Sequence, residues 1–372
     1  MAAHSVAEPR FDVVVWHDPV EPDAGKRRGG LPPRVGVAVT GSGSDRNARG
    51  RLRLAMIGAG WITQIHLGAL DRLGRTTLVG VAATREESVR ALATPRGAEA
   101  YTDIDRMLDE QRPDAAYVAV PPSEAVAMLD RLLERRIPFL TEKPLAATDR
   151  AGPERIAALV AERGVVAAVG YHLRALDALA EVRALLASNP AHLAIARWLS
   201  DTPGPAWWRR EASGGGQVVE QATHFYDLAR FLVGEATVVG AASTRSDPVV
   251  PADADVVDAT AAVLRFSTGA VGSFANTRRL GSAVVAIELA ASDLLIRIRR
   301  AGDAPGGWAV DFEDDDGVRT IPPGRDPYEA QAEVFVDAVE AGEPDRVLST
   351  YGDALETDRL TRAVVAATGH GG

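Results

Sequence analysis

Short apolar runs alternate with stretches of helical spacing from Arg53 onward, and this alternation limits the folds open to the chain. LAMIGAG precedes ITQIHLGALDRL, LVGVAAT precedes a helical stretch near residues 86–93, and AAYVAV precedes AVAMLDRLLERR and then IPFLTEKP. A strand followed by a helix and a second strand is a βαβ unit, whose strands pair in parallel. The sequence therefore predicts an α/β fold whose first part is a parallel sheet flanked by helices.

The pattern changes after residue 175. A long helix is expected there, followed by apolar runs such as AIARWLS, DATAAVLRFSTGAVGSFANT and AVVAIELA. Ser267, Thr268 and Gly269 separate two of these runs and predict a hairpin. Residues 326–342 have the spacing of an amphipathic helix that ends at Gly342. These features predict a second α/β region with a large, mostly antiparallel sheet.

Four segments are predicted in the 372 residues, because a single hydrophobic core rarely grows to this length. Residues 1–50 are rich in Gly, Pro and Ser without a sustained period, which is typical of a disordered tail. Residues 51–173 are expected to form the first domain and residues 174–345 the second. Residues 346–372 are expected to contain a C-terminal helix that packs back on the body.

Composition excludes several classes of function. The net charge of -10 offers no basic surface to nucleic acid, and a cysteine count of 0 rules out disulfides and thiolate chemistry. No apolar run approaches the ~20 residues of a membrane helix. Arg27 and Arg28 are followed by prolines and glycines rather than by the apolar core of a signal peptide. We expect a cytoplasmic protein without nucleic-acid or membrane partners.

The first motif that carries chemistry is Gly58-Ala59-Gly60, between the strand LAMI and the helix that Trp61 and Ile62 open. Glycines at such a turn let the backbone approach a diphosphate, which then lies at the positive end of the helix. Thr63 stands where the full fingerprint has Gly or Ala. The motif predicts a dinucleotide site, although a partial fingerprint is also found in ordinary tight turns.

The end of the second strand helps to distinguish the two nicotinamide cofactors. An acidic residue there would bind the ribose hydroxyls of NAD, but this chain has Thr84 and Arg85. A hydroxyl next to a guanidinium suits the 2′-phosphate of NADP. NADP(H) is therefore favoured and NAD(H) stays possible, since Arg85 is also compatible with a solvated loop and Glu86 weakens its positive field.

The stretch IPFLTEKPLA ends an apolar strand on charged residues. Ligands of open α/β sheets bind at the carboxyl ends of the strands, so Lys143 is expected to point into the cleft and Glu142 to lie beside it. Pro144 restricts the backbone of the lysine that precedes it. A turn with surface charges is the alternative for an isolated motif of this kind.

Five motifs in this order, GAGWITQIHLGAL, AVPPSEAV, TEKPLA, VGYHLR and SGGGQVVEQATHFYDLARFLVGE, resemble the glucose-fructose oxidoreductase, inositol dehydrogenase and MocA (Gfo/Idh/MocA) family. The resemblance implies a Rossmann NAD(P)-binding domain followed by an α/β domain with an open sheet, and a homodimer or homotetramer. It also implies that Lys143 and His224 are catalytic and that Pro121 and Pro122 border the cofactor. Family members act on a carbinol of a sugar, cyclitol or related small molecule.

The segment QVVEQATHFYDLARFL is expected to be a helix that carries Glu220, His224 and Asp227 near one face. A carboxylate beside an imidazole that titrates near neutrality is a common proton donor or acceptor for a hydroxyl that loses hydride. The alternative is a polar helix face bonded to neighbouring loops. Many dehydrogenases of the family have aspartate where this chain has Glu220, and histidine is common where it has Glu124.

Four further residues are candidates for the substrate site: Tyr171, His172 and Arg174 after the strand VVAAVG, and Trp208 before the glycines. An ordinary polar strand end and an oligomer contact are the respective alternatives. No metal site is expected, because His172, His224 and Glu220 match no ligand spacing and hydride transfer needs none.

The sequence thus predicts an NAD(P)-dependent dehydrogenase or reductase acting on CH–OH groups of a small molecule. Two alternatives stay open. One is a regulatory protein of the same fold that binds the dinucleotide and a protein partner without catalysis. The other is an NAD-dependent glycosidase, which oxidises and reduces the sugar again within one turnover.

Overall fold

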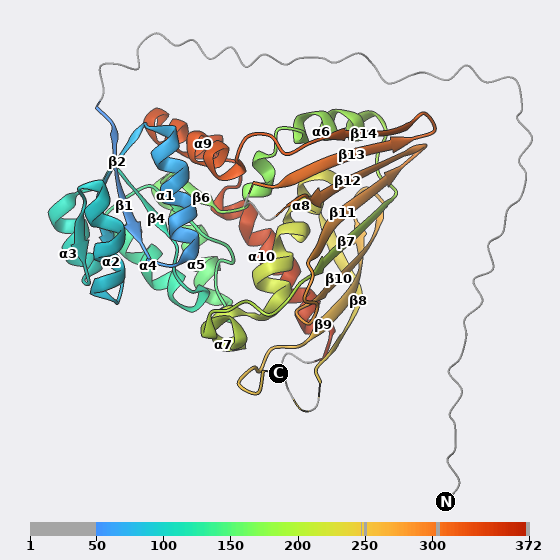
Figure 1. Ribbon diagram of the computed structural model, residues 1–372, viewed down its shortest axis with the longest axis horizontal. Coiled ribbons are helices and arrows are strands. Elements are labelled where there is room, and N and C mark those ends of the chain that lie inside the picture. The colour runs from blue at the N-terminus through green and yellow to red at the C-terminus, as the bar shows by residue number, and fades with distance from the viewer. Residues whose placement is uncertain (1–49, 247, 249–250, 303–305, 370–372) are drawn as a thin grey trace, which may run out of the picture. The chain divides into compact units, whose positions relative to one another are not determined.

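A computed structural model describes residues 50–369 except 247, 249–250 and 303–305 (Figure 1). The tail expected over residues 1–50 lies almost entirely outside the described residues, so that prediction is not tested. The described residues, 50–369 with those gaps, belong to one compact unit. It contains two sheets.

The first sheet has six strands in the order β3-β2-β1-β4-β5-β6, and every pairing in it is parallel. This is the strand order of a Rossmann fold, whose ligands bind at the carboxyl ends of the strands where the order reverses. The strands are β1 (Leu52–Ile57), β2 (Thr76–Ala82), β3 (Glu99–Tyr101), β4 (Ala115–Val118), β5 (Phe139–Thr141) and β6 (Ala167–Val169). Their helices are α1 (Trp61–Leu73), α2 (Glu86–Ala93), α3 (Ile104–Gln111), α4 (Pro122–Glu134) and α5 (Ala151–Arg163).

The second sheet has eight strands in the order β14-β13-β12-β11-β7-β10-β9-β8. All its pairings are antiparallel except that of β7 with β10. The expected hairpin joins β9 and β10 and turns at Gly269. The strands are β7 (Leu193–Leu199), β8 (Ala236–Thr244), β9 (Ala259–Phe266), β10 (Val271–Thr277), β11 (Val284–Ala291), β12 (Leu294–Arg300), β13 (Trp308–Asp314) and β14 (Gly317–Ile321). The predicted fold class is confirmed.

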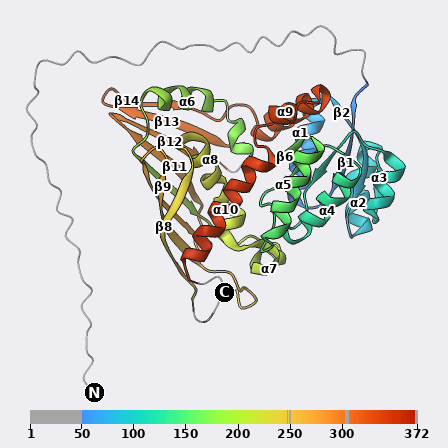
Figure 2. The ribbon, with the colours of Figure 1, turned by 180° about the vertical axis from the view of Figure 1, so that it is seen from behind.

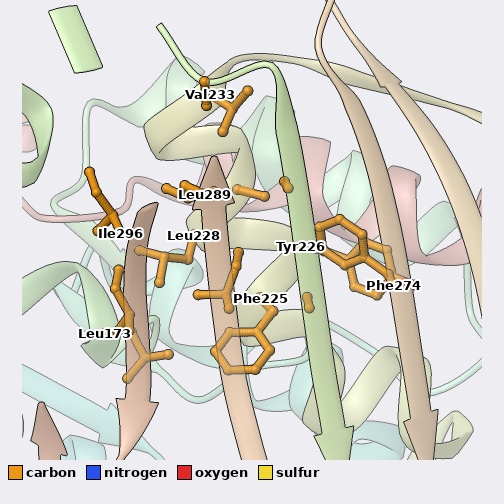
Figure 3. Packing of buried hydrophobic residues seen from close by; sticks show 14 of the residues in the cluster. Leu173, Phe225, Tyr226, Leu228, Val233, Phe274, Leu289 and Ile296 are labelled. Carbon is orange, nitrogen blue, oxygen red and sulfur yellow. The ribbon is translucent and has the colours of Figure 1, made fainter. Parts of the chain in front are cut away.

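The core of the second half lies between this sheet and two helices, α6 (Leu179–Ser188) and α8 (Thr223–Val233). Figure 3 shows Phe225 and Leu228 of α8 in the same apolar cluster as Leu289 of β11. Tyr226 stacks on Phe274 of β10 with ring centroids 4.8 Å apart. This apolar face of α8 packs on the sheet, so the polar residues of the helix lie on its opposite face.

The last two helices connect the halves of the molecule. Phe335 and Val336 of α9 (Pro327–Ala341) share an apolar cluster with Met56 of β1, so the chain returns to the first sheet after completing the second. The helix α10 (Tyr351–Ala367) lies between α5 and the second sheet (Figure 2). The boundaries expected at residues 173 and 345 stay predictions.

Candidate active site

Lys143 lies directly after β5, at the carboxyl edge of the parallel sheet, and its peptide bond to Pro144 is cis. Its ammonium donates to the Oε1 atom of Glu220 over 2.6 Å and to the main-chain oxygen of Glu220 over 2.7 Å. The two side chains are 12% and 14% exposed. Glu220 lies in a π-helical turn (Val218–Ala222) just before α8. The ion pair therefore joins the two halves of the molecule at the edge where a Rossmann fold binds its ligand.

Trp208 holds the other oxygen of this carboxylate. Its indole N–H donates to the Oε2 atom of Glu220 over 2.6 Å. The tryptophan lies in a 3-10 helix (Ala206–Arg209), is buried, and packs with Ala254 and Val256. The structure thus places this predicted substrate residue against Glu220.

The expected contact between Glu220 and His224 is wrong. Lys143 and Trp208 take both carboxylate oxygens of Glu220. Asp227 does not hold the imidazole either, because Arg174 donates to both of its oxygens over 2.6 and 2.8 Å. Each of these two buried carboxylates has a cationic partner, Lys143 or Arg174, whose charge offsets part of the desolvation cost. Arg174, predicted to line the substrate site, is a buried partner of Asp227 and Asp353.

His224 is instead enclosed by rings. His172 meets it edge-on at 4.7 Å between centroids, Tyr171 does so at 5.9 Å, and Trp198 stacks on it at 5.8 Å. Its Nδ1 atom has no hydrogen-bond partner among the described residues. Tyr171 is held by Thr223, whose hydroxyl lies 2.9 Å from the phenol oxygen.

Burial determines the charge of these histidines. Desolvation, followed by the charges of His172 and Lys143, lowers the pKa of His224 well below its usual range. Desolvation likewise lowers the pKa of His172 to about 3. The imidazole expected to titrate near neutrality is therefore neutral, and the same burial makes its protonated form less stable.

Glu142 faces the interior of the first domain. Its Oε1 atom lies 2.7 Å from the Nε2 atom of buried His66 in α1, and its Oε2 atom accepts from the main-chain N–H of Lys143 over 3.2 Å. Burial alone would raise the pKa of Glu142, but the hydrogen bond from His66 and nearby positive charge hold it below its usual value. A side chain at Gly170 would clash with this carboxylate. Glu142 thus fixes the turn that carries Lys143.

Sequence reasoning missed three residues near this site: His66, Trp198 and Tyr328. Tyr328 in α9 stacks on His172 at 4.3 Å and meets His66 edge-on at 5.4 Å. His66 was visible inside the motif GAGWITQIHLGAL, five residues after Trp61. Nothing local to Tyr328 indicates that it lies beside His172, because tertiary packing alone brings them together.

The glycine loop fits a dinucleotide. Gly58 has φ of 112°, and a Cβ there would lie 2.1 Å from the main-chain oxygen of Ala119, so the protein itself requires that glycine. A Cβ at Gly60 would meet no protein atom within 4 Å. Gly60 is the N-cap of α1 and no side chain caps the helix. The open space and the free N–H groups at the start of α1 are what a diphosphate needs. Trp61 is exposed beside the loop, and Ile62 is half-buried.

The other predicted cofactor residues also lie at the carboxyl edge. Thr84 and Arg85 follow β2 and are exposed. Arg85 makes no ion pair with any residue that the structure describes, whereas Glu86 is paired with Arg90 over 2.6 Å. Pro121 and Pro122 start α4 after β4. The donors around these strand ends fit an NAD(P) cofactor in kind and in place.

Comparison with known proteins agrees with this geometry. The model of an oxidoreductase family with an NAD-binding Rossmann fold, GFO/IDH/MocA, matches residues 52–171, and that of the GFO/IDH/MocA C-terminal domain matches residues 190–293. The chain belongs to this family. It is an NAD(P)-dependent dehydrogenase or reductase, as the sequence predicted.

Individual relatives are distant. Myo-inositol 2-dehydrogenase of Thermotoga maritima is 24% identical over 312 residues, which are 81% of this chain and 92% of that protein. A 3-ketoreductase of Actinomadura kijaniata, solved with NADP and TDP-benzene, has a TM-score of 0.76 at 21% identity, covering 85% of this chain and 98% of that one. Levoglucosan dehydrogenase, solved with NADH and levoglucosan, has a TM-score of 0.75 at 21% identity, covering 86% and 97%.

Two features are absent from the described residues. No helix in this part of the chain is long and apolar enough to span a membrane. Within the same residues, no three His, Asp or Glu side chains converge as a metal ion would require.

Proposed function

We propose that this chain is an NADP-preferring oxidoreductase that transfers hydride between the nicotinamide and a carbinol or carbonyl carbon of a sugar, cyclitol or related small molecule. The observation that carries the proposal is the ion pair of Lys143 with Glu220. Lys143 lies at the carboxyl edge of the parallel sheet, and Glu220 comes from the second half of the chain. Relatives named as an inositol dehydrogenase, a levoglucosan dehydrogenase and a 3-ketoreductase support the substrate class.

The residues divide the chemistry between them. A bound nicotinamide supplies the carbon that accepts or donates hydride. The ammonium of Lys143 stabilises the negative charge that develops on the substrate oxygen. His224 is neutral, and its Nδ1 atom has no partner among the described residues, so this nitrogen is the proton acceptor when the carbinol is oxidised. Glu220 holds the ammonium, and Glu142 holds the backbone that carries it.

The preference for NADP rests on the end of β2. Arg85 is exposed and unpaired within the described residues, so its guanidinium is available to a 2′-phosphate. The acidic neighbour that weakens this field, Glu86, is partly neutralised by Arg90. No carboxylate directly follows the strand to repel the phosphate.

A screen of sugars, cyclitols and their keto forms with NADP(H) and NAD(H), followed at the nicotinamide absorbance, tests the proposal. Oxidation or reduction of at least one class, with the higher kcat/KM for NADP(H), is expected. Net release of reduced cofactor separates this activity from a glycosidase, which restores its cofactor in each turnover. Tight dinucleotide binding without turnover of any class would favour the regulatory alternative.

A further inference from the structure

Lysine is scarce in this chain, and the position where it occurs matters. Of the 41 basic residues, only Lys26 and Lys143 are lysines, and Lys26 lies outside the described residues. Arginine makes the other buried ion pairs, such as those of Arg174 with Asp227 and Arg278 with Asp258. An ion pair with Glu220 alone could use arginine, so the compact ammonium at position 143 points to a role beyond that pairing.

The orientation of that ammonium follows from its bonds. A lysine has three N–H donors, and Glu220 takes two of them through its Oε1 and main-chain oxygen atoms. One donor is left for a substrate oxygen. The direction of this third N–H depends on both bonds to Glu220. The bond to Oε1 persists only if the carboxylate group does not rotate.

Trp208 holds the carboxylate of Glu220 in one orientation. Its N–H is 2.6 Å from Oε2 of Glu220, and the indole is 2% exposed, so the ring has little room to turn away. An indole has one donor, which Glu220 occupies, and Trp208 therefore has none to offer a substrate. The main chain of Trp208 lies 3.3 Å from where a Cβ of Gly214 would be, which packs the segment closely.

We propose that Trp208 is a positioning residue that aims the free N–H of Lys143 at the substrate oxygen through the carboxylate of Glu220. The inference rests on the proposed function, because it assigns the ammonium to the reacting oxygen. It replaces the sequence-based expectation that Trp208 contacts substrate. In this chain the one carboxylate of Glu220 reaches both the lysine and the indole.

Trp208→Phe tests this by removing the donor and keeping a ring in the buried site. Loss of one hydrogen bond to a charged group predicts a fall of about 10- to 100-fold in kcat. KM and the NADPH dissociation constant are expected to change by less than about twofold, since the indole donor binds neither ligand. Trp207→Phe is the matched control: Trp207 is the half-buried neighbour in the same short helix, and its indole bonds to no described residue.

A double-mutant cycle separates positioning from general support. If Trp208 acts through Glu220, then Trp208→Phe in a Glu220→Gln background should lower kcat by less than about twofold further. Full additivity of the two losses would overturn the proposal, as would a Trp208→Phe variant with wild-type kcat.

The two lysines allow a readout that needs no substrate. In a Lys26→Arg background, acetylation of Lys143 by acetic anhydride is followed by mass spectrometry of its peptide, with far-UV circular dichroism as the check of folding. Trp208→Phe should speed acetylation several-fold, Trp207→Phe should not, and Trp208→Phe with Glu220→Gln should match Glu220→Gln alone. Equal rates in wild type and Trp208→Phe overturn the positioning role. Absence of turnover with every substrate, together with faster acetylation, would overturn the proposed function and leave the link from Trp208 to Lys143 standing.

Discussion

Replacing Lys143 with methionine should abolish most of the hydride transfer while leaving the protein folded. Methionine keeps the apolar stem and loses the ammonium, so the developing charge on the substrate oxygen has no cation beside it. Loss of a positioned acid-base or electrostatic group typically lowers the rate by ~10²- to 10⁴-fold. The residues that we expect to hold the adenosine half of the cofactor follow β1 and β2, away from Lys143, and cofactor binding should survive.

The same change leaves Glu220 without its cation. Its Oε2 atom keeps the donor of Trp208, and its side chain is 14% exposed. We therefore expect a cost of about 1–3 kcal/mol in the free energy of unfolding, the range for a buried acceptor that loses one partner. The larger cost of a fully buried, unpaired charge does not apply.

Single-turnover hydride transfer at saturating NADPH, measured by stopped-flow absorbance, is the assay, and urea unfolding gives the stability. Lys143→Arg is the companion variant, because it keeps the charge and the pairing with Glu220. It should also be slow, since the planar guanidinium moves the donors away from the place of Nζ. A Lys143→Met rate within about tenfold of wild type would show that the lysine serves only the turn and that the mechanism is wrong.

Three other changes test separate parts of the structure. Gly60→Val should abolish dinucleotide binding at unchanged stability, because its side chain enters only the space left for the diphosphate. Gly58→Ala should instead destabilise the fold. NADPH fluorescence measures the binding, and urea titration measures the stability. Arg85→Asp should shift the ratio of kcat/KM from NADPH toward NADH without loss of stability, and a wild type that already prefers NADH would contradict the interpretation of β2. The depressed pKa of His172 means that the unfolded chain takes up the proton first, so stability is present above about pH 6.5 and is lost as the pH falls toward 3. Between pH 7 and pH 5 the free energy of unfolding should fall by about 2 kcal/mol through His172. His172→Gln should remove this fall, and the same change at exposed His192 should not. Urea unfolding at both pH values is the measurement.

Local patterns predicted the elements well where one element's own residues carry the signal. The helix expected near residues 86–93 is α2, with those bounds, and the helix expected over residues 326–342 is α9, which ends where Gly342 adopts the left-handed conformation. Both have a clear apolar stripe and a clear end. The glycine at residue 269 likewise marked the hairpin, because the turn needs a positive φ that other residues rarely adopt.

The order of the eight strands and the return of α9 to the first domain could not be predicted in the same way. Alternation of apolar and polar residues says that a strand has one buried face, but not which strand lies beside it. The parallel contact of β7 with β10 joins segments more than 70 residues apart. Ion pairs of Arg72 with Asp326 and of Arg75 with Asp337 help to hold α9 on α1, over sequence distances that no local pattern reports.

The error at the catalytic cluster has a specific cause. Spacing on one helix identified Glu220, His224 and Asp227 as neighbours, and neighbours on a helix are only candidates for pairing. The cationic partners of the carboxylates come from 77 residues away for Glu220 and 53 residues away for Asp227, and the second partner of Glu220, Trp208, comes from outside the helix as well. A second sequence signal supports the prediction for Lys143: this chain uses arginine for nearly every positive charge, so a lysine at a strand end points to a property that arginine lacks. Lys143 pairs with Glu220 in the turn before α8, and burial rather than a carboxylate partner sets the neutral state of His224.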